Sequence, residues 1–209
     1  MEENLLFRIL FVALYALFAG VRFYYRGKNL GRESEKQYEK MDKSFIVLSV
    51  AIIGYFILIA IYLILPDLVS WAELGLPSVI RWLSAGIALI AVVLTFLTHR
   101  TLGTQYSAKL EIQKDHTMIS EGIYSHIRHP MYTSMNIFML ALSVMSSNLL
   151  LIIFSVLVAL PFPWIARKEE ALLIERFGDD YRMYMKRTGR FLPSLGKNQD
   201  DDLNAERTS

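Results

Sequence analysis

A dense group of chemically capable side chains lies just before a long apolar stretch. It contains Tyr124, Arg128, His129 and Tyr132, with Pro130 between the histidine and the second tyrosine. Proline suits the first turn of a helix, because the N–H that it lacks would have no partner there. The backbone N–H groups of such a turn, together with the positive end of the helix dipole, favour a carboxylate or a phosphate. Arg128 and His129 would strengthen that anion site.

A second group of side chains offers carboxylates. Glu169 and Glu170 follow Arg167 and Lys168 directly after an uncharged stretch. The carboxylates would hold an ammonium group, the helix start a carboxylate, and an aromatic face an adenine or a sulfonium. S-adenosylmethionine combines these features. Taken singly, each group has a simpler interpretation: Arg-His-Pro before a span is an ordinary interfacial anchor, and Glu-Glu at a helix start is commonly solvated.

Long apolar stretches supply the elements that must position these two groups. A helix needs roughly 20 mostly apolar residues to cross a bilayer. Residues 131–166 carry no charge, which suits two helices joined by a turn at Ser146-Ser147-Asn148. We therefore predict an all-α integral membrane protein with five transmembrane helices, whose last two form a hairpin that brings both groups to one side. The predicted spans are residues 5–25, 45–65, 79–98, 131–146 and 149–166.

The distribution of basic residues predicts the orientation of the spans. Residues 26–43 contain six Lys and Arg, whereas residues 66–78 contain none. Every basic segment falls on one side if the N-terminus is outside and the C-terminus is cytoplasmic, which places both groups at the cytoplasmic face. Three arginines inside the spans lie near span ends, where their side chains are expected to reach the interface: Arg8, Arg22 and Arg81.

The chain after the last span is expected to lie at the cytoplasmic surface. Residues 167–187 have apolar side chains at helical spacing with charges between them, which predicts an amphipathic helix interrupted at Gly178. We expect residues 1–195 to form a single membrane domain. Residues 196–209 are polar and are expected to be disordered.

Composition excludes several kinds of site. The chain has no cysteine, so disulfides, thiolate nucleophiles and cysteine-ligated metals are ruled out. Its net charge of +2 is too small to indicate a nucleic-acid partner, and topology and anionic membrane lipids account for the basic loops. His126 and His129 have the spacing of a metal-binding pair, but no nearby carboxylate completes a site, so no metal is expected.

The chain also resembles a known family. The likeness is carried by His-Thr-Met-Ile at 116–119, Gly-Ile-Tyr at 122–124, Arg-His-Pro-Met-Tyr at 128–132, and two later elements at 169–170 and 177–193. Their order and spacing are similar to those of the isoprenylcysteine carboxyl methyltransferases, closest in style to short prokaryotic members with five spans. The likeness covers residues 105–193 and extends to a wider superfamily that includes phospholipid methyltransferases.

This resemblance implies an S-adenosylmethionine pocket and a lipophilic or prenylated substrate that enters from the bilayer. The positions implied for the cofactor, to which the residue pattern adds Glu170, are Lys109, His116, Thr117, Met118, Ile119, Tyr124, His129, Pro130, Met131, Tyr132 and Glu169. The family has glutamine at Lys109 and usually glycine at Ser134. Eukaryotic members place a substrate-binding arginine at the position of Ile165, so Arg167, two residues later, becomes the substrate-binding candidate. No catalytic residue is assigned.

We therefore predict an integral membrane methyltransferase that uses S-adenosylmethionine to O-methylate the carboxylate of an isoprenylcysteine-like or other lipophilic substrate. A carboxylate is already ionised at neutral pH and needs no strong base, whereas an amine acceptor would pass a proton to Glu169, Glu170 or His129. Three alternatives remain open. They are a phospholipid N-methyltransferase, an NADPH-dependent protein like the membrane sterol reductases, which also carry Arg-His-Pro-x-Tyr, and a non-enzymatic membrane protein that keeps the fold.

Overall fold

The structure is a computed structural model that describes residues 2–28, 34–37, 43–103, 111–113 and 118–194. Within these ranges the chain is mostly helical, with two short antiparallel strands, β1 (Ser34–Gln37) and β2 (Glu111–Gln113). The predicted disordered tail lies outside the described residues, as do Lys109, His116 and Thr117.

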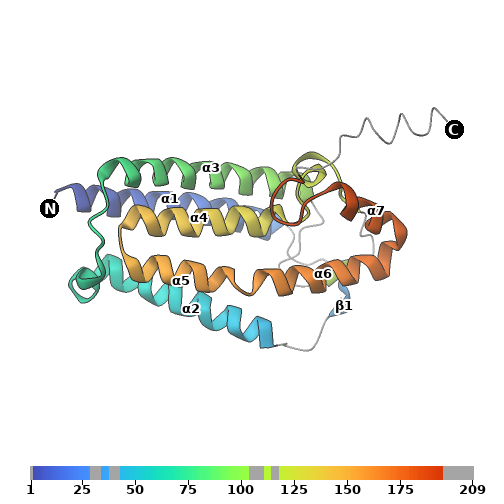
Figure 1. The fold of residues 1–209 in the computed structure, drawn as a ribbon, viewed down its shortest axis with the longest axis horizontal. Helices are drawn as coiled ribbons and strands as arrows, with labels where there is room; N and C mark the ends of the chain where they lie inside the picture. Colours follow the sequence, from blue (N-terminus) through green and yellow to red (C-terminus); the bar gives the residue numbers. More distant parts are fainter. Residues whose placement is uncertain (1, 29–33, 38–42, 104–110, 114–117, 195–209) are drawn as a thin grey trace.

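The helices form one elongated bundle. They are α1 (Glu2–Lys28), α2 (Lys43–Ile64), α3 (Ser78–Leu102), α4 (Pro130–Ser146), α5 (Leu149–Ala159), α6 (Phe162–Phe177) and α7 (Asp179–Arg187). Helix α4 packs on α3, α1 and α5, and α5 packs on α2. Figure 1 shows α1, α3 and α4 along one side, α2 and α5 along the other, and the N-terminus at the opposite end from α7.

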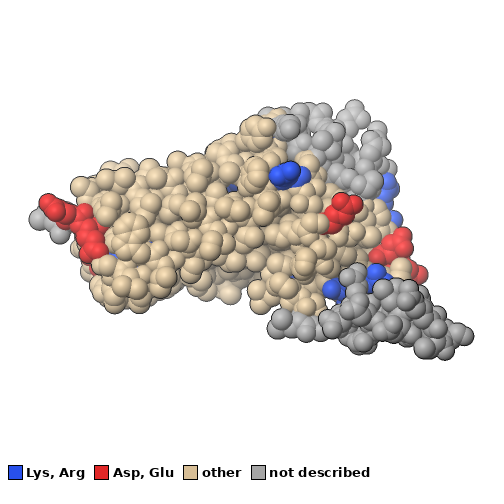
Figure 2. Space-filling model, turned by 90° about the horizontal axis from the view of Figure 1, so that it is seen from above, with Lys and Arg blue, Asp and Glu red and all other residues tan. Residues whose placement is uncertain are grey.

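Four helical stretches are long and apolar enough to cross a bilayer, by length and composition. They are Glu2–Gly27, Ile46–Ile64, Ser78–Leu102 and Leu149–Phe177. Helix α4 has 17 residues and is shorter than these, so the count of five spans stays a prediction. On the face shown in Figure 2, a broad uncharged surface separates charged side chains at the two ends, which is the pattern of helices that face lipid.

The turn predicted at Ser146-Ser147-Asn148 is confirmed, since it joins α4 to α5. Ser147 takes the left-handed conformation with φ of 58°, which ends α4. The Asn148 side-chain oxygen then accepts hydrogen bonds from the first N–H groups of α5 at 3.1 and 3.4 Å. The Asn148 amide donates to the carbonyl of Val69 at 2.9 Å. One asparagine therefore starts α5 and ties the hairpin to the loop after α2.

The helix that carries Glu169 and Glu170 begins earlier than predicted but ends at the predicted residue. A break at Leu160 and Pro161 ends α5, and α6 resumes at Phe162, not at the predicted residue 167. The carboxylates of Glu169 and Glu170 therefore stand on a helix whose first turns are apolar. Gly178, with φ of 57°, ends α6 and separates it from α7, at the residue where the sequence predicts an interruption.

Buried polar side chains tie the helices at the end remote from α7. Arg81 is only 5 % exposed, so the prediction that it reaches the interface is wrong. Its Nε donates to the Met145 carbonyl at 2.9 Å, and Nη1 donates to the Asn4 side chain at 2.8 Å. Its guanidinium also lies 3.8 Å from the ring centre of Phe7. Arg81 thereby joins α3 to α1 and α4.

Candidate functional site

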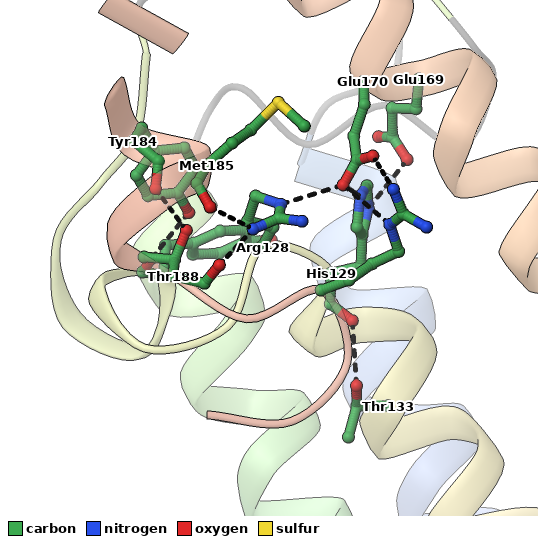
Figure 3. Close-up of polar contacts among 10 residues, drawn as sticks. Arg128, His129, Thr133, Glu169, Glu170, Tyr184, Met185 and Thr188 are labelled. Carbon is green, nitrogen blue, oxygen red and sulfur yellow. Dashed lines mark hydrogen bonds and ion pairs between the residues drawn. The ribbon is translucent and has the colours of Figure 1, made fainter. Parts of the chain in front are cut away.

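The two chemically capable groups of the sequence meet where α4 begins and α6 continues (Figure 3). His129 is buried and lies between two carboxylates. Its Nδ1 is 3.3 Å from Oε2 of Glu169, and its Nε2 is 3.3 Å from Oε1 of Glu170. The prediction that the helical hairpin brings both groups together is confirmed.

Glu170 holds the centre of a buried ion-pair cluster formed by Arg128, His129, Glu170 and Arg190, which we term the Glu170 cluster. The Glu170 side chain is 3 % exposed. Arg128 Nε donates to Oε1 at 2.9 Å, while Arg190 Nε donates to Oε1 at 3.0 Å and its Nη2 donates to Oε2 at 2.5 Å. Both carboxylate oxygens are therefore engaged, and the buried negative charge is compensated.

Arg128 extends the Glu170 cluster to the end of α7. Its Nη1 donates to the carbonyl of Met185 at 3.0 Å and also to the carbonyl of Thr188. The planar fork of a guanidinium can reach a carboxylate and two carbonyls at once, which an ammonium on a flexible stem does poorly. Arg128 thus has a structural role, joining Glu170 to the end of α7, whereas the sequence predicted that it would strengthen an anion-binding site.

The chain after α7 returns to pair with the residues before α4. Arg128 N–H donates to the Gly189 carbonyl at 2.8 Å, His129 N–H donates to the Arg190 carbonyl at 3.0 Å, and Gly189 N–H donates to the His126 carbonyl at 3.2 Å. A Cβ on Gly189 would lie 1.7 Å from the carbonyl oxygen of Leu192, so only glycine fits. This pairing delivers Arg190 to Glu170.

Arg190 is the site residue that sequence reasoning missed. A signal was present, because the resembling family shares a Thr-Gly-x-Phe-x-Pro pattern, which is Thr188 to Pro193 here. The pattern specifies the residues of the turn, but Arg190 stands at its first x position, which the pattern does not specify. The adjacent phenylalanine also contributes, since its carbonyl accepts a hydrogen bond from the Thr133 hydroxyl at 2.8 Å.

The predicted anion site at the start of α4 is smaller than the sequence suggests. The first helical hydrogen bond runs from Thr133 N–H to the His129 carbonyl at 3.2 Å. Pro130 has no N–H, and the His129 N–H is engaged by Arg190. At most two backbone donors of this turn, on Met131 and Tyr132, are left for an anion.

Aromatic rings line the site on the side of α6. The Tyr132 ring stacks on His129, with centroids 5.6 Å apart, and on Phe162 at 4.8 Å. Tyr124 is buried in the 3₁₀ turn Gly122–Ser125, and its carbonyl accepts a hydrogen bond from the Tyr184 hydroxyl at 2.6 Å. Burial raises the pKa of Tyr184 to about 12, so this phenol stays a donor at neutral pH. Tyr132 is therefore the predicted aromatic residue that adjoins the carboxylates.

Glu169 differs from its neighbour in having unused bonding capacity. Its side chain is 39 % exposed, yet Oε2 is buried and accepts no hydrogen bond among the described residues. That oxygen faces His129 at ion-pair distance without hydrogen-bond alignment. Burial disfavours the charged imidazolium of His129, but contacts with Glu169 and Glu170 outweigh it and raise the His129 pKa above its ordinary value.

The other predicted residues are less closely associated. Met118, Ile119 and Met131 are half-buried, and Arg167 is exposed without an ion pair to any described residue. The exposed His126 bonds through Nδ1 to the Ser125 hydroxyl at 2.8 Å instead of joining His129. Over the described ranges no group of three or more His, Asp or Glu side chains could hold a metal ion.

A cavity of about 240 Å³ lies between α4, the start of α6 and the segment after Arg190. The residues that line it are mostly apolar, and one of these residues, Phe162, also stacks on Tyr132. The residues that line it are Thr133, Asn136, Ile137, Ala159, Phe162, Pro163, Phe191 and Leu192. Such a space, next to a carboxylate site and within a bundle of apolar helices, suits a lipophilic group.

Comparison with known proteins shows a family likeness over the part of the chain that carries the site. Residues 84–175 match the sequence profile of the isoprenylcysteine carboxyl methyltransferase (ICMT) family. This segment includes His129, Tyr132 and both carboxylates of the site. Over this segment, a little under half of the chain, the protein is similar to the ICMT family. With its long apolar helices, it is a multi-pass membrane protein.

Curated relatives agree with this family. A protein-S-isoprenylcysteine O-methyltransferase of Schizosaccharomyces pombe is 33 % identical over 83 residues, which is 39 % of this chain and 35 % of the relative. One from Rattus norvegicus is 28 % identical over 139 residues, covering 60 % and 49 %. The nickel-cobalt-cadmium resistance protein NccN of Alcaligenes xylosoxydans is 31 % identical over 116 residues, covering 54 % and 53 %. The chain thus spans about a third to a half of these relatives.

A solved structure shares the fold. The eukaryotic intramembrane Ras methyltransferase ICMT aligns with a TM-score of 0.52 at 19 % identity, over 76 % of this chain and 55 % of that one. At this identity the likeness shows the fold alone.

Proposed function

We propose that this protein is a membrane-embedded methyltransferase that uses S-adenosylmethionine to O-methylate the carboxylate of an isoprenylcysteine-like or other lipophilic acceptor. The observation that carries the proposal is the placement of the Glu169 carboxylate. It lies beside His129, on which Tyr132 stacks, inside the segment that matches the ICMT family profile. One of its oxygens is buried and accepts no hydrogen bond from the described residues. The names of the curated relatives favour the same reaction.

The residues present fit the cofactor. Glu169 would hold the ammonium group, because its Oε2 faces His129 without hydrogen-bond alignment and accepts no hydrogen bond from the described residues. Glu170 would hold the neighbouring residues in place and would not contact the cofactor, since both of its oxygens already accept hydrogen bonds from Arg190. When bound, S-adenosylmethionine supplies an electrophilic methyl group on its sulfonium. The remaining cofactor contacts implied by the resemblance are Lys109, His116, Thr117, Met118, Ile119, Tyr124, Pro130, Met131 and Tyr132.

The protein's contribution would be orientation and the exclusion of water. A carboxylate acceptor carries its negative charge at neutral pH, and its methylation releases no proton, so the site needs no strong base. The Glu170 cluster fixes the start of α4 against α6, and the adjacent apolar cavity would hold the lipophilic part of the acceptor. The acceptor would enter sideways from the bilayer. The cofactor would enter from the cytoplasm, the side on which the distribution of basic residues predicts this end of the bundle to lie.

Methyl transfer tests the proposal directly. The full chain in lipid nanodiscs would be given S-adenosylmethionine with a labelled methyl group and an N-acetylated, S-prenylated cysteine. We expect label that base releases from the product, because methyl esters are base-labile. Base-stable label in phospholipid would indicate N-methylation instead. No label in any lipid, or thermal stabilisation by NADPH and not by S-adenosylmethionine, would overturn the proposal.

A variant pair tests the role of Glu169. Glu169→Gln removes the charge that would hold the ammonium group, and we expect about a tenfold to hundredfold loss of S-adenosylmethionine affinity with an unchanged thermal midpoint. Asp180→Asn makes the same chemical change at an exposed position of α7 and should bind like the wild type. Normal binding by Glu169→Gln would contradict this assignment.

A further inference from the structure

Asn136 brings a polar group to the apolar cavity beside the site. Among the described residues that line this cavity, it alone carries a side-chain amide. Its Oδ1 is buried and accepts no hydrogen bond from the part of the chain that the structure describes. An amide oxygen in apolar surroundings costs free energy as long as it has no donor. The last side-chain torsion of asparagine is soft, so the amide can turn this oxygen toward a ligand in the cavity.

Asn136 shares one face of α4 with residues of the site. Positions 129, 132, 133 and 136 follow the i, i+3, i+4, i+7 spacing of a single helix face. Because each helical residue adds about 1.5 Å, Asn136 stands about 6 Å further along the axis than Tyr132. Helix α4 runs from the site toward the end of the bundle with the N-terminus (Figure 1). Asn136 therefore lies one turn deeper between the helices than the Tyr132 ring.

The cavity and the site have walls in common. The Thr133 hydroxyl, which lines the cavity, donates to the carbonyls of His129 at 3.2 Å and of Phe191 at 2.8 Å. The ring of Phe191 lies 5.9 Å from that of His129, and the ring of Phe162 lies 4.8 Å from that of Tyr132, between centroids. Both phenylalanines also line the cavity. A single ligand can therefore place one end beside His129 and the other in the cavity.

The break between α5 and α6 adds a second acceptor to the cavity lining. Ala159 is the last residue of α5, and Pro163 has no N–H to donate to its carbonyl as a continuous helix would. Both residues line the cavity, and the described lining contains no charged side chain. Hydrogen-bond acceptors in an uncharged, mostly apolar lining favour a ligand that is lipophilic and carries a neutral donor such as an amide N–H.

We propose that Asn136 is a specificity-determining residue, whose amide oxygen accepts a hydrogen bond from an N–H group next to the carboxylate of the methyl acceptor. This inference rests on the proposed function. With the acceptor carboxylate beside His129 and the lipophilic chain in the cavity, the group that joins them passes Asn136. A lipophilic acid without a donor at this point leaves the oxygen unpaired and is the poorer acceptor.

The test compares three acids with the wild-type full chain in lipid nanodiscs. The first is an N-acetylated, S-prenylated cysteine. The second is an S-prenylated mercaptopropionic acid, which keeps the carboxylate and the thioether but lacks the amide. The third is the first with its amide nitrogen methylated, which keeps the bulk and removes the N–H. We expect the first to bind about three- to tenfold more tightly than the other two, as one hydrogen bond to a buried acceptor predicts.

Variants of Asn136 assign this preference to its amide. Asn136→Leu should lose the preference and raise KM for the first acid by a similar factor with little change in kcat. Its thermal midpoint should not fall, because an apolar side chain of similar shape replaces an oxygen without a donor. Asn136→Gln keeps the amide and should recover part of the preference. Ser84→Ala also removes a buried polar group, one that donates within its own helix to the Ile80 carbonyl, and should match the wild type.

Each outcome decides the proposal. Equal binding of the three acids by the wild type overturns it without any variant, and so does a preference that survives in Asn136→Leu. If Asn136→Leu gives no thermal transition, Asn136→Ala takes its place and is judged in the same way. The binding measurements need no turnover, so selective binding without methyl transfer would refute the proposed function alone. Methyl transfer to all three acids with equal KM would refute the role of Asn136 alone.

Discussion

The two ends of the bundle both bury arginines, but these arginines meet different partners. At the end with the N-terminus, Arg81 donates to the Met145 carbonyl and the Asn4 amide, and its cation faces an aromatic ring. At the other end, Arg128 and Arg190 both donate to the carboxylate of Glu170. The first arrangement compensates a cation with neutral dipoles, whereas the second compensates it with a charge.

This difference distinguishes the structural contacts of Arg81 from the ion pairs of the candidate functional site. The bonds of Arg81 join helices through acceptors that do not ionise, so they persist over a wide range of pH. The Glu170 cluster also includes His129, whose proton is exchangeable, and it assembles α4, α6 and the segment after α7. Damage at the remote end should therefore reduce stability alone, while damage to the Glu170 cluster should reduce stability and cofactor binding together.

The largest effect is expected from Glu170→Gln. It leaves the buried guanidinium of Arg128 and the partly exposed guanidinium of Arg190 without their counter-charge. Removing one partner of a buried ion pair typically destabilises a protein by about 3–5 kcal/mol. Thermal and denaturant unfolding in detergent would measure the loss, and S-adenosylmethionine binding should disappear with it. Asp179→Asn is the matched control, because it breaks an exposed ion pair with Arg182 and should change little. Equal effects of the two changes would refute the structural role of the Glu170 cluster.

Gly189→Ala should have the next largest effect and destabilise the protein by about 3 kcal/mol. The new Cβ would overlap the Leu192 carbonyl and displace the segment after α7 from the start of α4. We expect weaker cofactor binding as well, since the same displacement withdraws Arg190 from the Glu170 cluster. Gly20→Ala on α1 places its Cβ in open space and serves as control. The comparison fails if both variants unfold at the same temperature.

Asn148→Ala tests the remote end. Loss of the helix cap and of the bond to the Val69 carbonyl should cost about 1–2 kcal/mol. In contrast to the two changes above, affinity for S-adenosylmethionine should stay at the wild-type level, which isothermal titration would show. Ser70→Ala removes only an exposed hydrogen bond and should be neutral. A cofactor defect in Asn148→Ala would mean that the two ends are coupled.

The smallest effect is a pH dependence that belongs to the site end. Since the pKa of His129 is raised in the folded protein, its protonation contributes stability fully below the unfolded value of about 6.5. That contribution is lost as pH rises through the folded pKa, so the thermal midpoint should fall over the range just above pH 6.5. His129→Gln should flatten this part of the profile, while the exposed His126→Gln should keep it. A wild-type midpoint that rises over the same range would contradict the assignment.

The parts of the fold that the sequence predicts depend on local signals. Runs of apolar residues mark the long helices, and Ser146 to Asn148 mark the hairpin turn because their side chains bond to nearby backbone. Once the hairpin is known, it follows that His129 and Glu169 lie close together. Gly178 is likewise visible as a break, since a helix ends readily at a glycine with positive φ.

The division of labour between Glu169 and Glu170 could not be predicted in this way. The two carboxylates are adjacent in sequence and differ by about 100° of rotation on α6. Only the direction of Arg128 and the return of Arg190 decide which of them is neutralised, and the latter depends on a backbone pairing between segments about 60 residues apart.

The pairing of residues 189–190 with residues 126–129 has a consequence for biosynthesis. Helices α3 to α6 can join the bundle in the order of synthesis, because each of them packs on a helix already made. Arg190, however, leaves the ribosome only after all of them, so during translation Glu170 waits in the nascent chain with Arg128 but without its second partner. A chaperone or quality-control protease would thus meet a nearly complete bundle whose Glu170 cluster lacks Arg190. Ribosome-bound chains stalled before and after residue 190 should therefore differ sharply in the resistance of the Glu170 cluster to proteolysis.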